Sequence, residues 1–328
     1  MRKGVNPEKF KEERNIQKYH RVLVVCYIPN VQDDYYKESV AVLEKSLNSL
    51  INTINLETTS ITFINNNSTV EVDDLIKGYL LTNQIDKYVL YNENRGKVYA
   101  VIDEVRSVFE PYVTIADCDV LFLNNWEDAV FSVFKNNPKA GVVSPLPCPG
   151  LALYLNENIF SDLYLFGGIK YTKEVTDYDI DLYVQGVNNF ALINRENKSS
   201  WKEKQYIVKR KNSKAVVGAS HFVATYKSFI FKGETSFPEI KFKNGYEQNF
   251  IDVLASKKGL YRLSTIKTHA YHIGNKLDDF TLNYQFLEND KQHKVNFSRI
   301  TPVDQKTLFH GYIFKKIVFK FLNKLFKF

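Results

Sequence analysis

Short apolar runs alternate with stretches of helical periodicity from Arg21 onward, and this alternation limits the fold more than any other feature. Residues 21–30 begin with a continuous apolar run and end in a Pro-Asn turn signal, which is typical of a buried strand. Residues 33–56 show helical spacing. The same alternation continues with strands predicted at 60–64, 88–90 and 111–116. Helices are predicted at 72–81 and from the residues after Lys97 to Val108. Such a chain forms a largely parallel sheet with helices on both faces.

The composition favours a globular protein in a reducing compartment. The 328 residues are 44% hydrophobic, and no apolar run approaches the roughly 18 to 20 residues that cross a bilayer. The first six residues include the charged Arg2 and Lys3 and lack the apolar core of a secretory signal. The three cysteines show no Cys-x-x-Cys spacing, which argues against a disulfide framework and against a structural zinc site. We therefore expect a cytoplasmic protein.

Two carboxylates stand where the predicted strand 111–116 ends. Asp117 and Asp119 follow this strand, and a second apolar run follows them at once. Ligands of open α/β sheets bind at the carboxyl ends of strands, and hard cations take oxygen ligands from one or two carboxylates plus substrate phosphates. The pair predicts a divalent metal, Mn²⁺ or Mg²⁺, bridging a diphosphate; the alternative is a solvated turn that caps the strand. A second acidic run at 177–181 has no apolar strand before it.

The net charge of +7 indicates an acidic partner, and the lysines gather at the C-terminal end. On a helix over 306–328, Lys316, Lys320, Lys324 and Lys327 fall within about 80° of arc opposite the apolar residues. Basic amphipathic helices of this kind lie in the headgroup plane of anionic membranes, and the alternative is a helix docked on its own core. Nucleic-acid binding is not expected, because these lysines do not interleave with aromatics across a groove.

Several common site motifs are missing. No Gly-x-Gly-x-x-Gly or Gly-x-x-x-x-Gly-Lys-Ser/Thr loop follows the first strand, so the dinucleotide-binding and P-loop interpretations lack their motif. Residues 218–222 lack the final glycine of a nucleophile elbow, which leaves serine hydrolase chemistry unsupported. Any phosphate must therefore be held by another arrangement.

Motifs in order along residues 21–275 resemble the GT-A glycosyltransferases, especially the family 2 group that uses nucleotide-sugar donors. The matching segments are 27–30, 65–68, 94–96, 117–119, 217–225, 245–248, 258–261 and 269–274. The resemblance implies a GT-A (Rossmann-like), mixed, mostly parallel α/β sheet flanked by helices. It also implies transfer of a sugar by direct displacement, with inversion, and a metal that stabilises the departing diphosphate.

The resemblance also assigns the donor site. It implies that Asp119 ligates the metal directly and that Asp117 contacts metal or ribose. His272 matches the family's late histidine better than His269 does, as a metal or phosphate ligand; the alternative is a structural histidine. The remaining donor-binding candidates lie at the ends of the first two predicted strands and in the segment before the helix that ends at Val108. They are Tyr27, Pro29, Asn66, Asn67, Asn94 and Gly96.

The resemblance leaves more than one candidate for the general base. The acceptor hydroxyl must lose a proton, and Glu247 is the leading carboxylate for it. The family places an aspartate after this glutamate, whereas this chain has Gln248, which cannot accept that proton. The alternatives are Asp252 as the base, or weak or absent catalysis. Glu247 could also be only a glutamate that favours a helix start.

The predicted organisation has four parts. They are a polar extension at 1–20, a GT-A domain at 21–275 (donor half 21–120, acceptor half 121–275), a connector at 276–305 and a basic amphipathic helix at 306–328. The expected function is a metal-dependent glycosyltransferase at the inner membrane face, acting on a glycan or lipid-linked acceptor. The alternatives are a nucleotidyltransferase, which usually has a Gly-rich loop missing here, and a catalytically silent GT-A-fold binding protein.

Overall fold

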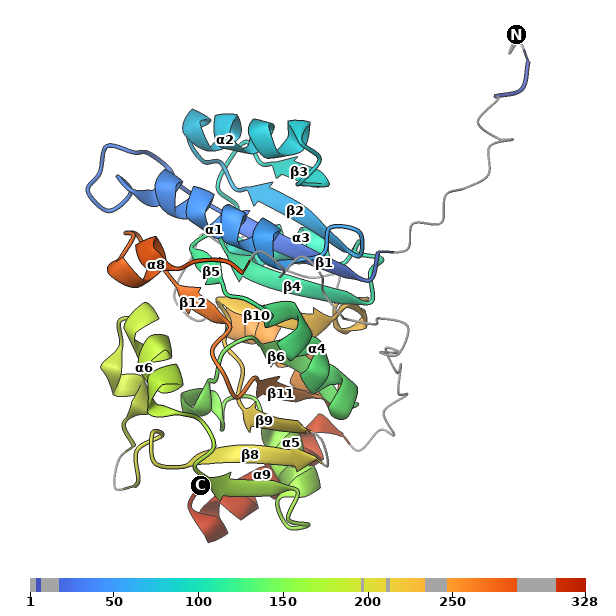
Figure 1. The fold of residues 1–328 in the computed structure, drawn as a ribbon. Helices are drawn as coiled ribbons and strands as arrows, with labels where there is room; N and C mark the ends of the chain where they lie inside the picture. Colours follow the sequence, from blue (N-terminus) through green and yellow to red (C-terminus); the bar gives the residue numbers. More distant parts are fainter. Residues whose placement is uncertain (1–3, 7–17, 196–197, 211–212, 234–246, 288–310) are drawn as a thin grey trace.

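The centre of the molecule is a sheet with the strand order β3-β2-β1-β4-β10-β6-β11-β9-β8-β7 (Figure 1). The computed structural model describes residues 4–6, 18–195, 198–210, 213–233, 247–287 and 311–328, and the strands are named within these ranges. The strands of the large sheet are β1 His20–Cys26, β2 Thr59–Asn65, β3 Lys87–Leu90, β4 Tyr112–Asp117, β6 Ala140–Ser144, β7 Ile169–Thr172, β8 Gln205–Arg210, β9 Ser213–Val217, β10 Val223–Lys227 and β11 Tyr261–Ser264. A small second sheet pairs β5 (Val120–Phe122) with β12 (Ala270–His272).

The N-terminal half forms the parallel part of the sheet, as predicted. β1 pairs in parallel with β2 and with β4, and β2 pairs in parallel with β3. β1, β2 and β4 are almost wholly buried, as near-continuous apolar strands covered on both faces should be. One face carries α1 (Ser39–Thr53), α2 (Val70–Leu81) and α4 (Trp126–Asn136), and the other carries α3 (Lys97–Val105) and α7 (Val253–Lys257).

Strand direction changes beyond β4. β10 pairs antiparallel with both β4 and β6, β11 is parallel to β6, and β9, β8 and β7 continue antiparallel. Among the described strands of this sheet, β3, β2, β1, β4, β6, β11 and β8 therefore share one direction, and β10, β9 and β7 run against it. The expected mixed, mostly parallel α/β fold is confirmed.

The described residues of segment 151–212, within the predicted acceptor half, form the far end of the sheet and its cover. They contain α5 (Glu157–Leu163), β7, α6 (Asp177–Gly186), β8 and the 3₁₀ turn η3 (Phe190–Ile193). The remaining short elements among the described residues are η2 (Pro149–Leu151), η4 (Ser228–Ile230), the π-helix η5 (Gln248–Asp252) and α8 (Asp279–Asn283).

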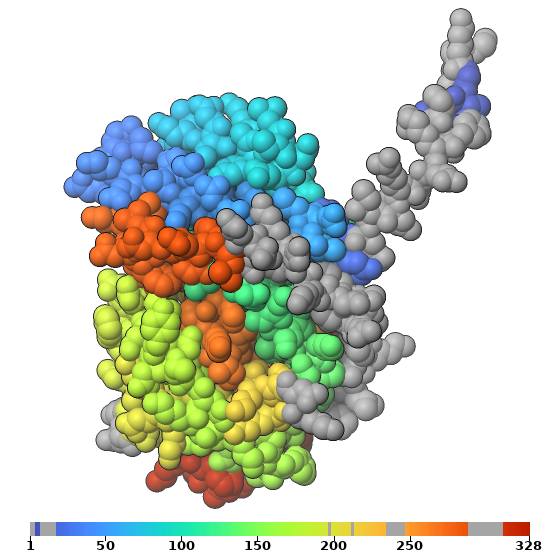
Figure 2. Space-filling view, viewed as in Figure 1, coloured from blue at the N-terminus to red at the C-terminus, as the bar shows by residue number. Residues whose placement is uncertain are grey.

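After β11 the chain returns to the N-terminal half. Figure 2 shows the β12–α8 segment lying between the α1 region and the α6 region. β12 pairs antiparallel with β5, and Leu123 N–H donates to His269 O over 2.9 Å. The end of the predicted domain is thereby placed beside β5, the strand that follows the two aspartates.

The C-terminal helix α9 (Tyr312–Phe326) docks on α5. Leu322 and Phe328 are buried, and the rings of Phe160 and Phe319 are 5.5 Å apart. Lys315 Nζ lies 3.0 Å from the carboxylate of Asp162. The docked-helix alternative is thus correct for one face of α9, while the opposite apolar residues stay exposed.

Parts of the predicted organisation lie outside the described residues. These are 1–3 and 7–17 of the extension, 288–305 of the connector, 306–310 of the final helix and 245–246 of the motif before Glu247. Within the described ranges, no helix combines the length and apolar character needed to span a bilayer. The domain boundaries themselves stay a prediction.

Candidate metal and donor site

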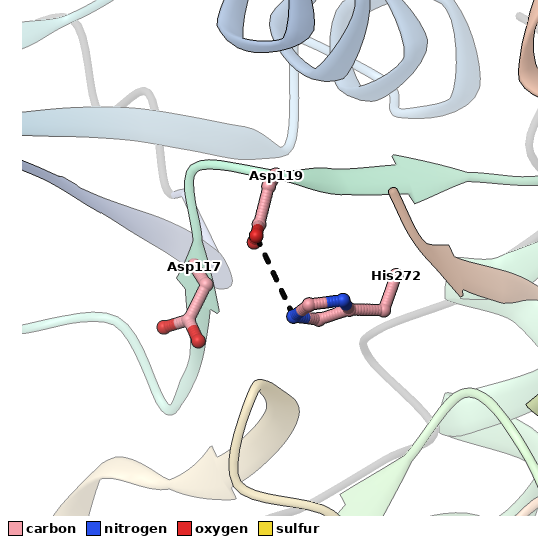
Figure 3. A group of neighbouring side chains, drawn as sticks. All are labelled: Asp117, Asp119 and His272. Atoms are coloured by element: carbon pink, nitrogen blue, oxygen red, sulfur yellow. Dashed lines mark ion pairs between the residues drawn. The ribbon is translucent and has the colours of Figure 1, made fainter. Parts of the chain in front are cut away.

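Asp117, Asp119 and His272 converge at the carboxyl end of β4. Asp117 is the last residue of β4, and Asp119 precedes β5 in the short turn between the two strands. The antiparallel register sets His272 opposite Val120, and Ile273 N–H donates to Asp119 O over 2.8 Å. The potential ligand atoms of the three side chains all lie within 4.8 Å of one another, with Asp119 and His272 pointing toward each other (Figure 3).

The chemistry of this group fits a divalent cation. Asp119 Oδ2 and His272 Nε2 are 3.5 Å apart, and Asp119 Oδ1 is buried with no hydrogen-bond partner among the described residues. Burial raises the pKa of Asp119 to about 6, His272 opposes this shift, Asp117 adds to it, and Lys97 opposes it. A carboxylate oxygen without a hydrogen-bond donor, as in Asp119, and an imidazole nitrogen are ligands that Mn²⁺ accepts, and a bound cation would offset the charge of both aspartates.

A backbone carbonyl orients His272 for such a role. His272 Nδ1 lies 3.3 Å from Gly186 O at the end of α6, so Nδ1–H is the donor there, and Nε2 faces Asp119 as the nitrogen that a metal would use. The ring also stacks edge-on against Phe222, with centroids 4.9 Å apart. A Cβ at Gly186 would lie 3.0 Å from His272 O and 3.1 Å from His272 N. Glycine therefore allows this close approach.

Lys97 is a central residue that the sequence analysis did not select. It is the first residue of α3, and its Nζ forms ion pairs with Asp117 and, at 2.9 Å, with Glu247 Oε1. Burial by itself lowers the pKa of Lys97, but Asp117 and Glu247 outweigh it and raise the pKa above its ordinary value. One signal was available: a lysine at the first residue of a helix opposes the helix dipole, which indicates specific acidic partners.

The two candidate bases occupy different surroundings. Glu247 lies at the start of the π-helix η5 and is joined to Asp117 through their common partner Lys97. Asp252, at the other end of η5, is 1% exposed and pairs with Arg262 Nη1 at 3.1 Å. Tyr154 OH also donates to Asp252 Oδ2 over 3.0 Å. Both oxygens of Asp252 are thus engaged in a buried network, which favours Glu247 as the base.

Some donor-side candidates form hydrogen bonds between loops, and others are accessible to a ligand. Asn66 is 2% exposed; its Nδ2 donates to Asn94 Oδ1 over 3.0 Å, and its Oδ1 accepts from Arg95 N–H at 2.9 Å. Gly96 N–H also donates to Asn94 Oδ1, and Gly96 has φ of 81°. These side chains tie the loop after β2 to the loop before α3.

The other donor-side candidates lie beyond the ends of β1 and β2. Tyr27 follows β1 and is 40% exposed, and Pro29 is half-buried two residues later. Asn67 is exposed and left-handed, with φ of 69°. Tyr27 and Asn67 therefore remain accessible to a ligand at this edge of the sheet.

The rival acidic run has a structural role at the start of α6. Asp179 N–H donates to Thr176 Oγ1, which caps the helix, and Asp179 Oδ1 accepts from Thr268 N–H at 2.7 Å. Asp177 pairs with the exposed Lys173. The lack of an apolar strand before residues 177–181 is therefore a reason to prefer Asp117 and Asp119 as the candidate metal ligands.

Comparison with known proteins places a family match on the first half of the chain. The sequence model described as "Glycosyl transferase family 2" matches residues 35–196, which include Asp117 and Asp119. No curated protein matches the chain in sequence.

Similar solved structures have low identity. The mannosyltransferase PcManGT from Pyrobaculum calidifontis, in complex with GDP-Man and Mn²⁺, is 13% identical over 76% of this chain and 55% of its own, with a TM-score of 0.43. S. aureus TarS 1–349 is 13% identical over 77% of this chain and 59% of its own, with a TM-score of 0.45. GalNAc-T7 with UDP, GalNAc and Mn²⁺ is 12% identical over 79% of this chain and 44% of its own, with a TM-score of 0.47. The chain therefore spans little more than half of the length of the first two structures.

Proposed function

We propose that this family 2-like glycosyltransferase of the GT-A fold transfers a sugar from a nucleoside-diphosphate donor to a glycan or lipid-linked acceptor. The observation that carries the proposal is the convergence of Asp117, Asp119 and His272 at the carboxyl end of β4. In an open α/β sheet this edge is where ligands bind.

The three residues would hold a divalent cation, with Asp119 and His272 as direct ligands and Asp117 toward metal or ribose. When bound, the cation would act as a Lewis acid that neutralises charge on the departing diphosphate. Tyr27 and Asn67 are placed to contact the nucleoside, because both are accessible beyond the ends of neighbouring parallel strands. Asn66, Asn94 and Gly96 keep the surrounding loops in position.

Glu247 is the proposed general base. The acceptor oxygen forms a bond to the anomeric carbon as the bond to the donor phosphate oxygen breaks, and the hydroxyl proton passes to the Glu247 carboxylate. Direct displacement of this kind inverts the anomeric centre. The shared partner Lys97 supports the assignment, since it holds Glu247 close to the metal-binding aspartate.

The exposed face of α9 supports a location on an anionic membrane. Five apolar side chains on this face are at least 60% exposed: Ile313, Phe314, Ile317, Phe321 and Leu325. Lys320, Lys324 and Lys327 are exposed beside them. An apolar stripe flanked by lysines matches the boundary between headgroups and acyl chains. We place the enzyme at the cytoplasmic leaflet, where its free cysteines Cys26, Cys118 and Cys148 would stay reduced.

A thermal-shift panel of UDP-, GDP-, CMP- and dTDP-sugars, with and without Mn²⁺, tests the donor site. We expect one nucleotide class to stabilise the wild type only with Mn²⁺, by about 2.7 kcal/mol at 100 times its dissociation constant. Asp119→Asn should lose this stabilisation. Asp74→Asn is the matched control, because Asp74 forms an exposed ion pair on α2 and should keep the response.

Two outcomes would change the conclusion. The absence of stabilisation by any donor would contradict the proposed site. Metal-dependent donor binding without donor hydrolysis or transfer to any offered acceptor would indicate a silent GT-A-fold binding protein, and synthesis of a sugar nucleotide from a nucleoside triphosphate would indicate a nucleotidyltransferase.

A further inference from the structure

Lys97 connects two carboxylates that the proposed reaction uses for different purposes. Its Nζ forms ion pairs with the metal-side Asp117 and, at 2.9 Å, with the candidate base Glu247. The side chains are largely enclosed, with exposed fractions of 16% for Lys97, 27% for Asp117 and 16% for Glu247. Ion pairs in such a site are screened much less by salt than pairs on the surface.

The ammonium group of Lys97 would repel a metal cation bound to Asp117, because both positive charges would lie at the same carboxylate. A divalent cation bound to Asp117 would weaken the ion pair between Asp117 and Lys97, because the two cations repel each other across the carboxylate. Asp119 and His272 do not share this conflict, since their ligand atoms face each other and Asp119 Oδ1 has no hydrogen-bond partner in the described part of the chain.

A released Lys97 has a suitable second partner in the donor. A diphosphate held by a cation at Asp117 and Asp119 presents anionic oxygens at the carboxyl end of β4, next to the first residue of α3. Lysine binds phosphate as a compact point charge on a flexible stem, so a small movement of Nζ suffices. Its ion pair with Glu247 would at the same time hold the base beside the reacting groups.

We propose that Lys97 exchanges partners during donor binding: it pairs with Asp117 before the metal binds, and it contacts the donor diphosphate once the metal has taken Asp117. This inference rests on the proposed metal and donor site. Lys97 thereby opposes the binding of metal alone and favours the binding of metal together with diphosphate. The two effects have opposite signs, which damage to the fold would not produce.

The experiment measures two affinities in the full chain. Mn²⁺ binding without nucleotide is followed by the electron paramagnetic resonance of free Mn²⁺, and the binding of UDP, GDP and dTDP is measured by calorimetry at saturating Mn²⁺. The variants are Lys97→Met and Lys97→Arg. Lys87→Met is the matched control, because Lys87 pairs with Glu104 away from the site.

Lys97→Met should bind Mn²⁺ alone about 10-fold more tightly and the nucleotide about 10-fold more weakly, as expected for loss of a single charge in an enclosed site. Lys97→Arg should restore both affinities toward wild type, and Lys87→Met should change neither. Lys97→Met affinities that fall together or stay unchanged would overturn the inference. A wild type that binds Mn²⁺ but none of the nucleotides would instead refute the proposed function, and the Mn²⁺ arm would still test the competition at Asp117.

Discussion

The position of one glycine governs the orientation of the histidine in the site. Gly186 ends α6 and places its carbonyl oxygen 3.3 Å from His272 Nδ1, while its Cα faces the His272 backbone with no room for a side chain. Partners that orient a metal ligand in this way are typically worth 10- to 100-fold in metal affinity. The contact between α6 and β12 therefore supports the proposed metal site, although Gly186 offers no ligand.

Gly186→Ala should push His272 away from Asp119 and weaken Mn²⁺ binding by roughly 10-fold. The measurement is a Mn²⁺ titration, with circular dichroism to verify folding. Gly78→Ala is the control, because a Cβ at Gly78 in α2 meets no atom within 4 Å. The control should stabilise the helix by about 0.5 to 1 kcal/mol and leave metal binding unchanged. Wild-type Mn²⁺ affinity in Gly186→Ala would refute the role of this carbonyl.

At the scale of elements, the π-helix η5 lies between the proposed base, Glu247, and a carboxylate engaged in a buried ion pair, Asp252. Glu247 precedes η5 and faces Lys97, whereas Asp252 ends it and anchors Arg262 of β11. Arg262 also donates to Ala219 O over 3.1 Å, which joins η5 and β11 to the loop before β10. π-Helical turns are frequent at functional sites, and here the turn places two carboxylates in opposite roles.

Asp252→Asn should therefore lower the free energy of unfolding by about 3 kcal/mol, because it leaves Arg262 charged, buried and incompletely paired. Glu247→Gln should lower the free energy of unfolding less than Asp252→Asn does, because Lys97 keeps its ion pair with Asp117, and it should abolish transfer while donor binding persists. Urea unfolding and a transfer assay on both variants separate the two roles. A stable Asp252→Asn protein without transfer, beside an active Glu247→Gln protein, would assign the base to Asp252.

At the scale of the whole molecule, α9 has more apolar surface than one contact can cover. Phe319, Leu322 and Phe328 pack against α5 and its surroundings, and the stripe from Ile313 to Leu325 remains on the outside. In a protein of net charge +7, the lysines beside this stripe direct it toward an anionic surface. The docked face holds the helix against α5, and we propose that the outer face contacts lipid.

Wild type should float with vesicles that contain phosphatidylglycerol and not with pure phosphatidylcholine, and high salt should weaken binding, because the Debye length falls to about 3 Å at 1 M. Combined Ile317→Ser, Phe321→Ser and Leu325→Ser substitutions should abolish flotation with little loss of stability, since each residue is at least 60% exposed. The combination Lys320→Gln, Lys324→Gln and Lys327→Gln should reduce binding and its salt dependence. A serine variant that loses self-association instead, with no vesicle binding in wild type, would assign the stripe to a second copy.

Local patterns predicted the parallel half of the fold well. The strands at 60–64, 88–90 and 111–116 each lie within about a residue of β2, β3 and β4, because a buried strand between two helices needs an apolar run with turn residues beside it. The C-terminal helix was predicted over 306–328 and is described from Tyr312. The segment 151–212 resisted prediction, because its short elements depend on contacts with the rest of the sheet rather than on a long periodic pattern.

The sequence by itself determined that two carboxylates stand at the end of a buried strand, since a strand of period two and the turn after it are local properties. Only the tertiary structure decided which groups meet them. The Gly186–His272 contact joins residues 86 positions apart, and Lys97 reaches Asp117 and Glu247 across three separate elements. Such contacts depend on the register of β12 with β5 and on the packing of α3 beside η5, which are set by the burial of the whole core and leave no periodic trace in the sequence.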